Sequence, residues 1–331
     1  MIDETSDARS FVLRVPEDQG EKFAYRPGQF LTVRVPGPDG FPLARCYSLS
    51  SAPGTDPHLK ITVKRVKGGA ASNWICDHVR PGDALEVLPP AGAFTPKPRT
   101  NDVLLVAAGS GITPVISIAK AILARPEGTA ALLYANRDES SVIFARELRD
   151  LADRARHRLR VVHLLESLQG LPTEAALAGL TAPFAGADAA FVCGPEPFMD
   201  AVTAALRTVG MPAGRIVVER FRSLTGDPFA DPSPAPAGET VAAQVDVTLD
   251  GTRHSLAWPA ETPLLDLLLS QGLEAPFSCR EGACSACACR VTAGEVKMLR
   301  NDVLEDEDLE EGWVLGCQSV PVTDHVEITY D

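Results

Sequence analysis

The sequence predicts a multidomain protein of class β plus α/β plus α+β: an antiparallel β-barrel, a doubly wound α/β domain and a small β-grasp domain. Short runs of alternating apolar and polar residues, broken by proline and glycine, occupy residues 9–90 and are typical of a small barrel. From residue 102, continuous apolar runs alternate with helical stretches, as in a parallel sheet covered on both faces. A hairpin, a helix and a cysteine-rich loop follow one another over residues 243–290, as in a β-grasp domain.

The barrel is expected over residues 1–98, with two motifs that suit a phosphate-bearing aromatic ligand. In RCYS (45–48), Arg45 can neutralise a pyrophosphate, Tyr47 can stack on a ring and the Ser48 hydroxyl can bond a ring nitrogen. In VKRVKGGAAS (63–72), glycines 68 and 69 let the backbone approach a phosphate, and Ser72 is expected to cap a helix. An ordinary barrel edge and a capped surface helix are the alternative.

The α/β domain is expected over residues 99–222. The strand at 102–109 runs into GSGITP (109–114) and a helix at 115–124, and this order makes an anion-binding turn. Further strands are expected at 130–135, 158–165 and 189–194. The last ends in CGPEPFM (193–199), which places Cys193 at the carboxyl end of the sheet, where such folds bind ligands. The basic run RARHRLR (154–160) is interpreted as a solvated helix end, not a nucleic-acid site.

A proline-rich linker is expected at 223–242 and a β-grasp domain at 243–331, with strands at 243–249 and 252–258 and a helix from Thr262 to the stop at Gly272. Its loop SCREGACSACACR (278–290) places Cys279, Cys284 and Cys287 in C-x4-C-x2-C spacing, and Cys317 follows downstream. This is the ligand spacing of a plant-type [2Fe–2S] cluster. A zinc site would favour two separated knuckles, and disulfides are rare in the cytosol. Cys289 does not fit the ligand pattern.

Together these motifs resemble the ferredoxin–NADP⁺ reductase superfamily with a plant-type ferredoxin domain at the C-terminus. Within it, the domain order resembles reductase components of bacterial oxygenases, including phenylacetyl-CoA oxygenase reductase. Three stretches, YANRDESSVIF (134–144), LLESLQGLPT (164–173) and ERFRSLTGDPF (219–229), are most similar to reductases of 3-ketosteroid 9α-hydroxylase. The cluster loop departs from many relatives in having Ser285-Ala286 where they have Gly-Thr.

The resemblance implies FAD, a [2Fe–2S] cluster and a nicotinamide nucleotide as cofactors, although FMN reductases share the domain order. It implies that Ser48, Cys193 and Glu219 line the hydride-transfer site and that Phe221 covers the flavin ring. The remaining cofactor contacts that it implies are Arg45, Tyr47, Val63, Lys64, Gly69, Ala71, Ser72, Gly109, Gly111, Thr113, Pro114, Arg137, Gly194 and Pro195.

The implied function is to pass electrons from NADH through FAD and the cluster, one at a time, to a partner oxygenase, of Rieske type or similar. Another acceptor, a free flavin reductase or an oxidase is the alternative, and a non-enzymatic carrier would not oxidise NADH. NADPH is disfavoured because Leu164-Leu165-Glu166-Ser167 places a carboxylate where NADPH-using relatives carry an arginine. Arg137 and Ser141 lie near enough in the preceding loop to weaken that argument.

The net charge of −13 is concentrated at the C-terminal end. Residues 244–331 hold 17 acidic and 5 basic side chains, and EDEDLEE (305–311) alone holds six acids. Such a surface is unsuited to nucleic acids or anionic membranes, and it predicts a basic docking partner. Solubility alone is the other explanation. The polar N-terminus has no apolar core of a signal peptide, so we expect a cytoplasmic protein without a membrane span.

Overall fold

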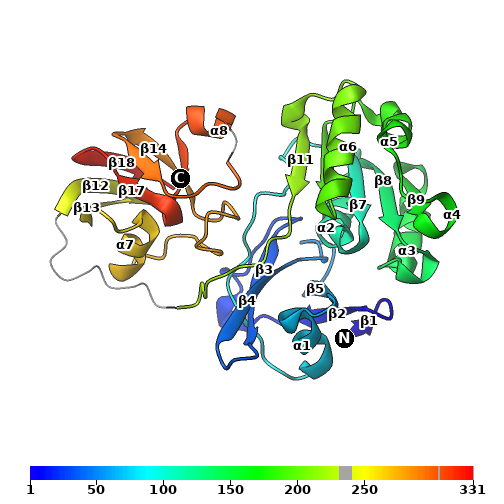
Figure 1. Cartoon of the computed structure of the whole chain (residues 1–331), viewed down its shortest axis with the longest axis horizontal. Helices are drawn as coiled ribbons and strands as arrows, with labels where there is room; N and C mark the ends of the chain where they lie inside the picture. The colour runs from blue at the N-terminus through cyan, green and yellow to red at the C-terminus, as the bar shows by residue number, and fades with distance from the viewer. Residues whose placement is uncertain (231–240, 305, 331) are drawn as a thin grey trace. The chain divides into compact units, whose positions relative to one another are not determined.

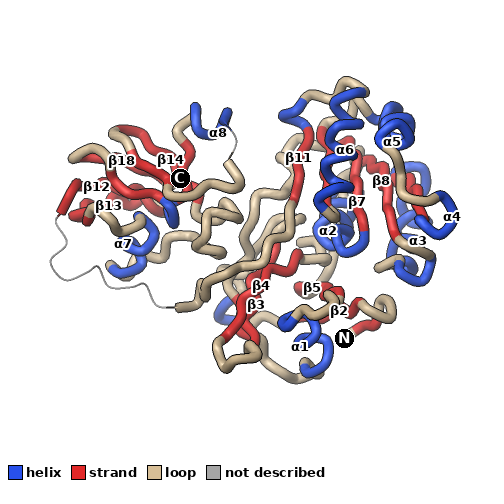
Figure 2. Tube along the Cα trace, in the orientation of Figure 1, coloured by secondary structure: helices blue, strands red, loops and turns tan. Residues whose placement is uncertain are grey.

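A computed structural model describes residues 1–230, 241–304 and 306–330. It divides into two compact units, one of residues 1–90 and 94–223 and a second of residues 91–93 and 224–331. The predicted barrel and α/β domain therefore lie in the same unit, each around its own hydrophobic core. Figure 2 shows helices and strands in both units. Within the described residues, no helix is both long enough and apolar enough to cross a bilayer.

Two antiparallel three-stranded sheets form the barrel, in the orders β1-β2-β5 and β4-β3-β6. A bridge between Leu49 and Ile61 joins them, and β-branched and aromatic side chains fill the interior. The elements are β1 (Ile2–Asp3), β2 (Ala8–Leu13), β3 (Phe30–Pro36), β4 (Pro42–Ser48), β5 (Leu59–Lys64), α1 (Ala70–His78) and β6 (Glu86–Val87).

The α/β part has five parallel strands in the order β11-β10-β7-β8-β9. Helices α2 and α3 bury apolar side chains on one face, and α5 and α6 cover the other (Figure 1). The predicted doubly wound fold is confirmed. The elements are β7 (Asp102–Ala108), α2 (Ile112–Leu123), β8 (Thr129–Asn136), α3 (Ala145–Ala155), β9 (Leu159–Leu165), α4 (Glu166–Gln169), α5 (Glu174–Thr181), β10 (Ala189–Cys193), α6 (Glu196–Thr208) and β11 (Ile216–Glu219).

The sequence analysis missed β11, because four residues of strand after a surface turn give too short a pattern to recognise. The basic run at 154–160 does span the end of α3 and the start of β9, as predicted. Arg158 is nevertheless more than a solvated charge. Its guanidinium donates to the carbonyls of Leu123, Arg125 and Gly128 and so secures the turn after α2.

The second unit has the predicted β-grasp fold. Its five-stranded mixed sheet runs β13-β12-β18-β14-β16, and the apolar side chains of α7 are buried in its core with Trp258. Strands β15 and β17 form a separate pair. The elements are β12 (Val241–Leu249), β13 (Thr252–Pro259), α7 (Leu264–Ser270), β14 (Ala288–Ala293), β15 (Val296–Met298), α8 (Asp306–Glu310), β16 (Trp313–Leu315), β17 (Ser319–Pro321) and β18 (His325–Thr329).

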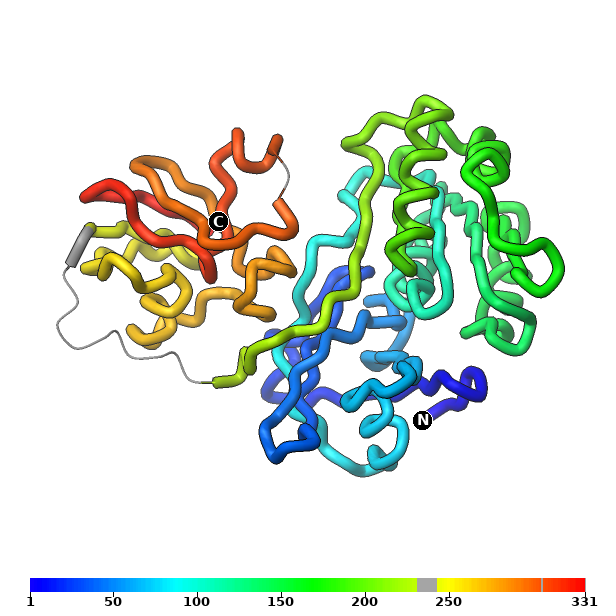
Figure 3. The backbone as a smooth tube through the Cα atoms, viewed as in Figure 1, coloured from blue at the N-terminus to red at the C-terminus, as the bar shows by residue number. Residues whose placement is uncertain are grey.

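The start of the predicted linker is fixed to the second unit. The Glu281 carboxylate in the cysteine-rich loop accepts hydrogen bonds from the Thr225 amide and hydroxyl, at 2.8 and 2.9 Å, and from the Gly226 amide. Arg280 donates to the Ala230 carbonyl at 2.7 Å. Figure 3 traces this segment beyond β11 as far as the grey residues. Residues 231–240 of the predicted linker lie outside the described part of the chain.

Candidate functional site

The four predicted cluster ligands come from two segments of the second unit. Cys279, Cys284 and Cys287 lie in the loop between α7 and β14, and Cys317 follows β16. Three of the four side chains are almost fully buried, and Cys284 is partly exposed. The loop takes a left-handed backbone at Arg280, Gly282 and Ser285. These turns fold the chain back on itself, so that it presents sulfur atoms from closely spaced positions.

Backbone amides surround the sulfur atoms. The amides of Glu281 and Ala283 point at Cys279 Sγ at 3.4 and 3.3 Å. The Cys279 amide is 3.4 Å from Cys284 Sγ, and the Cys317 amide is 3.4 Å from Cys287 Sγ. Such N–H···S contacts stabilise negative charge on a thiolate-ligated cluster. The donor set and its surroundings therefore fit a [2Fe–2S] cluster.

Gly282 is the residue that lets this loop close. Its φ is +71°, and a Cβ there would lie 2.9 Å from the Arg300 carbonyl oxygen and 3.1 Å from Gln318 Cγ. Cys289 instead points into the apolar core of the sheet, with 0% exposure, and its thiol lies 3.8 Å from the Val314 carbonyl. Burial raises the pKa of the Cys289 thiol, which suits a protonated core residue.

The nucleotide-domain motifs meet where the strand order of the parallel sheet reverses, between β7 and β10. Gly109 and Gly111 follow β7, and Gly194 follows β10. A Cβ on Gly111 would lie 2.1 Å from the Cys193 carbonyl oxygen, and one on Gly194 would lie 2.9 Å from the Ala108 side chain. The two turns are thus in direct contact at the switch point, where open α/β sheets bind their ligands.

Other residues that were predicted to contact the cofactors lie near the Gly109–Gly111 turn. Lys64 lies next to Gly109, because a Cβ built on Gly109 would be 3.6 Å from the lysine nitrogen. Lys64 and Arg137 share the carboxylate of Asp7, at 3.8 and 3.5 Å. The Thr113 hydroxyl bonds the Ser110 carbonyl and Pro114 is buried in α2, so both contribute to the start of the helix. Pro195 is the residue that precedes α6.

Sequence reasoning missed Tyr134, which supports the same turn from β8. Its hydroxyl donates to the Gly109 carbonyl at 3.1 Å, and its ring is fully buried. Burial also raises the pKa of the Tyr134 phenol, so it remains a donor. The sequence shows that Tyr134 places a hydroxyl group on an otherwise apolar strand. No local pattern indicates that this hydroxyl bonds the Gly109 carbonyl.

The predicted flavin contacts of the barrel lie on β4, β5 and α1. Arg45, Tyr47 and Ser48 are on β4, and the Arg45 guanidinium donates to the Ala44 carbonyl at 2.7 Å. Burial raises the pKa of the Tyr47 phenol, and Ser48 is 6% exposed. Val63 and Lys64 end β5, and Ala71 lies in α1.

One expectation about the barrel was wrong. Ser72 does not cap α1, because Gly68 has a φ of +73° and turns the chain early, so that the helix begins at Ala70 after Gly69. The Ser72 hydroxyl instead accepts a hydrogen bond from the Val66 amide at 3.1 Å. It therefore shapes the glycine turn from inside the first helical turn.

Of the three residues predicted at the hydride-transfer site, the structure pairs two. Cys193 and Glu219 are direct neighbours on β10 and β11. Cys193 has 0% exposure, and burial together with the neighbouring Glu219 charge raises the pKa of its thiol. Burial raises the pKa of Glu219 to about 7. Ser48 lies on β4 of the barrel, and Phe221, 50% exposed, follows β11.

The raised pKa of Glu219 predicts a pH-dependent step. Hydride loss leaves positive charge on a nicotinamide ring, and an ionised carboxylate nearby would stabilise that charge. We expect the limiting rate of flavin reduction by a nicotinamide nucleotide to rise as pH increases through about 7, with the profile flattened in Glu219→Gln. Stopped-flow reduction at pH 5.5–8.5 measures this. An unchanged pH profile in the variant would show that the ionisation of Glu219 does not control the rate.

Ionisation of Glu219 should have the opposite effect on stability from its effect on the reduction rate. A carboxyl whose pKa is raised on folding favours the protonated folded state, so its contribution is complete below the ordinary glutamate pKa and is lost as pH rises through about 7. Unmutated protein should therefore lose some thermal stability relative to Glu219→Gln as pH rises from 4.5 to about 7, and the difference should level off above that. The opposite trends distinguish a catalytic effect of ionisation from a general effect on folding.

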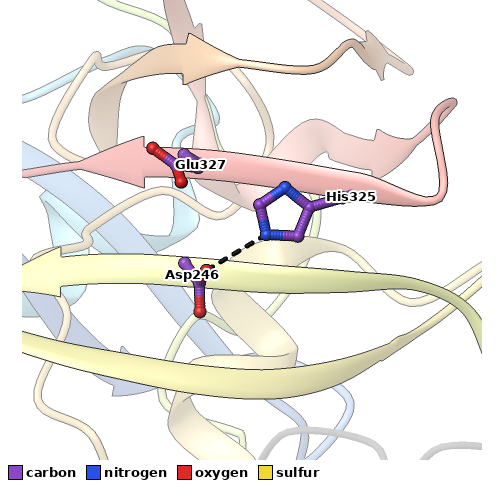
Figure 4. A group of neighbouring side chains, drawn as sticks. All are labelled: Asp246, His325 and Glu327. Carbon is purple, nitrogen blue, oxygen red and sulfur yellow. Dashed lines mark hydrogen bonds and ion pairs between the residues drawn. The ribbon is translucent and has the colours of Figure 1, made fainter.

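A separate group of polar residues lies on the sheet of the second unit. Asp246, His325 and Glu327 approach closely enough to suggest a metal site (Figure 4). Arg253, however, already contacts both carboxylates at 2.8 Å, and His325 Nε2 lies 3.0 Å from Asp246. Hydrogen bonds from Ser255, Arg253 and His325 hold the pKa of Asp246 well below its usual value. We assign this group to surface ion pairing, since an arginine occupies the cation position.

Family models match three parts of the chain. They are the oxidoreductase FAD-binding domain over residues 2–95, the oxidoreductase NAD-binding domain over 105–204, and the 2Fe-2S iron-sulfur cluster binding domain over 247–322. These domains match the predicted FAD, nicotinamide nucleotide and [2Fe–2S] cofactors.

Similar proteins match this chain along nearly its whole length. The ferredoxin reductase component of 3-ketosteroid-9-alpha-monooxygenase from Rhodococcus rhodochrous is 54% identical and covers 100% of this chain and 95% of its own. A component of the 1,2-phenylacetyl-CoA epoxidase of Escherichia coli is 35% identical over 99% of this chain and 95% of its own. The solved phthalate dioxygenase reductase, described as modular for electron transfer from pyridine nucleotides to [2Fe–2S], has a TM-score of 0.55 and 25% identity, covering 98% of this chain and 94% of its own.

Proposed function

The chain belongs to the family of oxygenase reductases that combine FAD-binding, NAD-binding and [2Fe–2S] domains, and on that basis we propose that it carries electrons from NADH to the terminal oxygenase of a 3-ketosteroid 9α-hydroxylase. It is an NAD(P)H-dependent electron-transfer oxidoreductase. The choice of steroid oxygenase rests on relatives that carry this name at 51–54% identity across the whole chain.

The chain holds the parts that this electron path requires. A flavin accepts two electrons as hydride and releases them singly, while a [2Fe–2S] cluster accepts one at a time. The proposed roles of the residues follow from their positions. Residues of β4, β5 and α1 bind the flavin, and the turns after β7 and β10 bind the nucleotide. Ser48, Cys193 and Glu219 line the reaction site, Phe221 covers the flavin ring, and the four cysteines bind the cluster. The contact between the Gly111 and Cys193 turns is the single observation that supports this arrangement most strongly.

NADH is the proposed donor, because the segments after β8 and β9 present a carboxylate. Glu166 begins α4 immediately after β9, and the Ser167 amide bonds the Arg137 carbonyl at 2.8 Å, so the two segments lie together. Arg137 is itself paired with Asp7. A carboxylate can accept hydrogen bonds from a free ribose diol but repels a 2′-phosphate.

The function is tested by mixing the purified full-length protein with NADH or NADPH without oxygen. NADH is expected to bleach the bound flavin and then the cluster absorption, with a kcat/KM above that for NADPH. A gel-filtration step should leave the flavin on the protein, which separates this reductase from a free flavin reductase. An equal or larger kcat/KM for NADPH would contradict the nucleotide choice, while no bleaching with either would contradict the reductase function.

We further propose that the acidic side chains of α8 form part of the docking surface for the oxygenase. Asp306, Glu307 and Asp308 occupy its first turn, and α8 precedes β16, which leads directly to Cys317. Glu305 of the predicted acidic run lies outside the described residues. Opposite charges on two partners speed their encounter, and salt screens this attraction over about 10 Å at 0.1 M.

Neutralising the three acids in the first turn of α8 to Asn and Gln is expected to slow electron transfer to the oxygenase several-fold at low salt, with ferricyanide reduction unchanged. The salt dependence of the remaining rate should also become weaker. The triple variant Asp250→Asn, Glu295→Gln and Asp324→Asn is a matched control, since it removes the same charge from exposed positions elsewhere in the second unit. Equal rates and salt slopes in both triple variants would show that only net charge matters.

A further inference from the structure

Two lysines are buried in the first unit, on different parts of its fold. Lys60 lies on β5 of the barrel and is 8% exposed, while Lys120 lies on α2 of the α/β part and is 5% exposed. A buried ammonium group is costly unless it is paired and hydrogen-bonded. The charges around these lysines should therefore be arranged specifically.

Glu147, in the first turn of α3, is the anion that the two lysines share. Its Oε2 lies 2.7 Å from Lys60 Nζ, and its Oε1 contacts Lys120 Nζ. Asp56 supplies a second carboxylate 3.0 Å from Lys120, and the Ser50 carbonyl accepts from the same lysine at 3.1 Å. The positive charges of the two lysines are thus balanced by the negative charges of two carboxylates.

Further directional bonds attach α2 to the barrel. The Ser117 hydroxyl donates to the Ser51 carbonyl at 2.6 Å and accepts from the Gly28 amide at 3.3 Å. Ser117 and Lys120 lie one helical turn apart, on the same side of α2. Because α2 begins directly after the Gly109–Gly111 turn, these bonds link the position of the nucleotide-binding turn to that of the barrel.

We propose that Glu147 is a positioning residue for hydride transfer, which fixes the α/β part against the barrel by binding a lysine from each. This inference rests on the proposed reductase function. Apolar surfaces can slide with little change in energy, whereas charged hydrogen bonds between buried groups have one favourable geometry. Hydride transfer requires its two reacting rings to be held accurately, and a displacement of about 1 Å can cost roughly 100-fold in rate.

The first variant is Glu147→Gln in the flavin-loaded, full-length protein. Its limiting rate of flavin reduction by NADH is expected to fall by roughly 10- to 100-fold. The dissociation constant for NAD⁺ is expected to change less than threefold, because Glu147 does not belong to the predicted nucleotide contacts. Thermal unfolding should occur at a lower temperature, since one buried lysine charge loses its anion.

A charge-balanced double variant separates positioning from stability. Lys60→Met with Glu147→Gln leaves Lys120 paired with Asp56, so thermal stability is expected to recover towards that of the unmutated protein. The reduction rate should remain low, because the bond between the barrel strand and α3 is still absent. Glu174→Gln is the matched control, as an exposed glutamate in the first turn of α5, and should reduce at the unmutated rate.

Normal flavin reduction in the double variant would overturn the proposal and leave the network a stabilising one. An equal loss of rate and of NAD⁺ affinity in Glu147→Gln would also overturn it, because the defect would then be in binding. The unmutated protein is the reference for both. If neither NADH nor NADPH reduces that protein, the proposed function is wrong. If either nucleotide reduces it, the ratio between variant and unmutated rates with that nucleotide decides the Glu147 proposal.

Discussion

Cys317→Ser is expected to abolish the visible absorption and the reduced-state electron paramagnetic resonance signal of a [2Fe–2S] cluster. A serine hydroxyl is a poorer iron ligand than a thiolate, and Cys317 is the proposed ligand that lies outside the main loop, after β16. The same change at Cys279, Cys284 or Cys287 should have the same result. Flavin reduction by NADH should persist, because the barrel and the α/β part form a compact unit of their own.

Cys289→Ser is the internal control for these variants. Its side chain is equally buried and lies only two residues from Cys287, but it points into the core of the sheet. The thiol lies 3.8 Å from the Val314 carbonyl, too far for a serine hydroxyl at this position to donate to it, so the variant should retain the cluster and lose only stability, by about 1–3 kcal/mol. A full cluster spectrum in Cys317→Ser, or its loss in Cys289→Ser without unfolding, would contradict the ligand assignment.

The sequence predicted those features that depend on local pattern. The C-x4-C-x2-C spacing marks one loop because three ligands must come from neighbouring positions. Likewise, GSGITP after an apolar strand predicts a glycine turn that leads into a helix, and the structure has this turn between β7 and α2. Both predictions depend only on residues within a short stretch of sequence.

Features that depend on contacts between distant segments could not be predicted in this way. Lys60 and Glu147 are 87 residues apart, and each resembles an ordinary surface charge in the sequence. The bonds from Thr225 to Glu281 similarly span 56 residues, so the segment containing Thr225 resembled the start of a free linker. The wrong cap at Ser72 has a local cause, since the left-handed turn at Gly68 lets α1 begin at Ala70, before the serine.

Gly111→Ala is expected to reduce NADH-dependent flavin reduction by roughly 100-fold or more, through displacement of the turn that we propose binds the nucleotide. The added methyl carbon would lie 2.1 Å from the Cys193 carbonyl oxygen, 2.4 Å from its carbon and 2.8 Å from the Gly194 amide nitrogen. All three atoms belong to the backbone, so no side chain can rotate to make room. The turns after β7 and β10 must move apart, at a cost of about 1–3 kcal/mol in stability.

Gly179→Ala is the matched control for this variant. Gly179 lies in α5, and a Cβ built there meets no atom within 4 Å, so alanine should raise stability by about 0.5–1 kcal/mol through its better helix propensity. Flavin reduction by NADH and the dissociation constant for NAD⁺, measured with chemical denaturation of both variants, distinguish local displacement from unfolding. Because the cysteines are untouched, Gly111→Ala should keep its cluster spectrum. A normal rate in that variant would show that the contact between the Gly111 and Cys193 turns does not shape the nucleotide site.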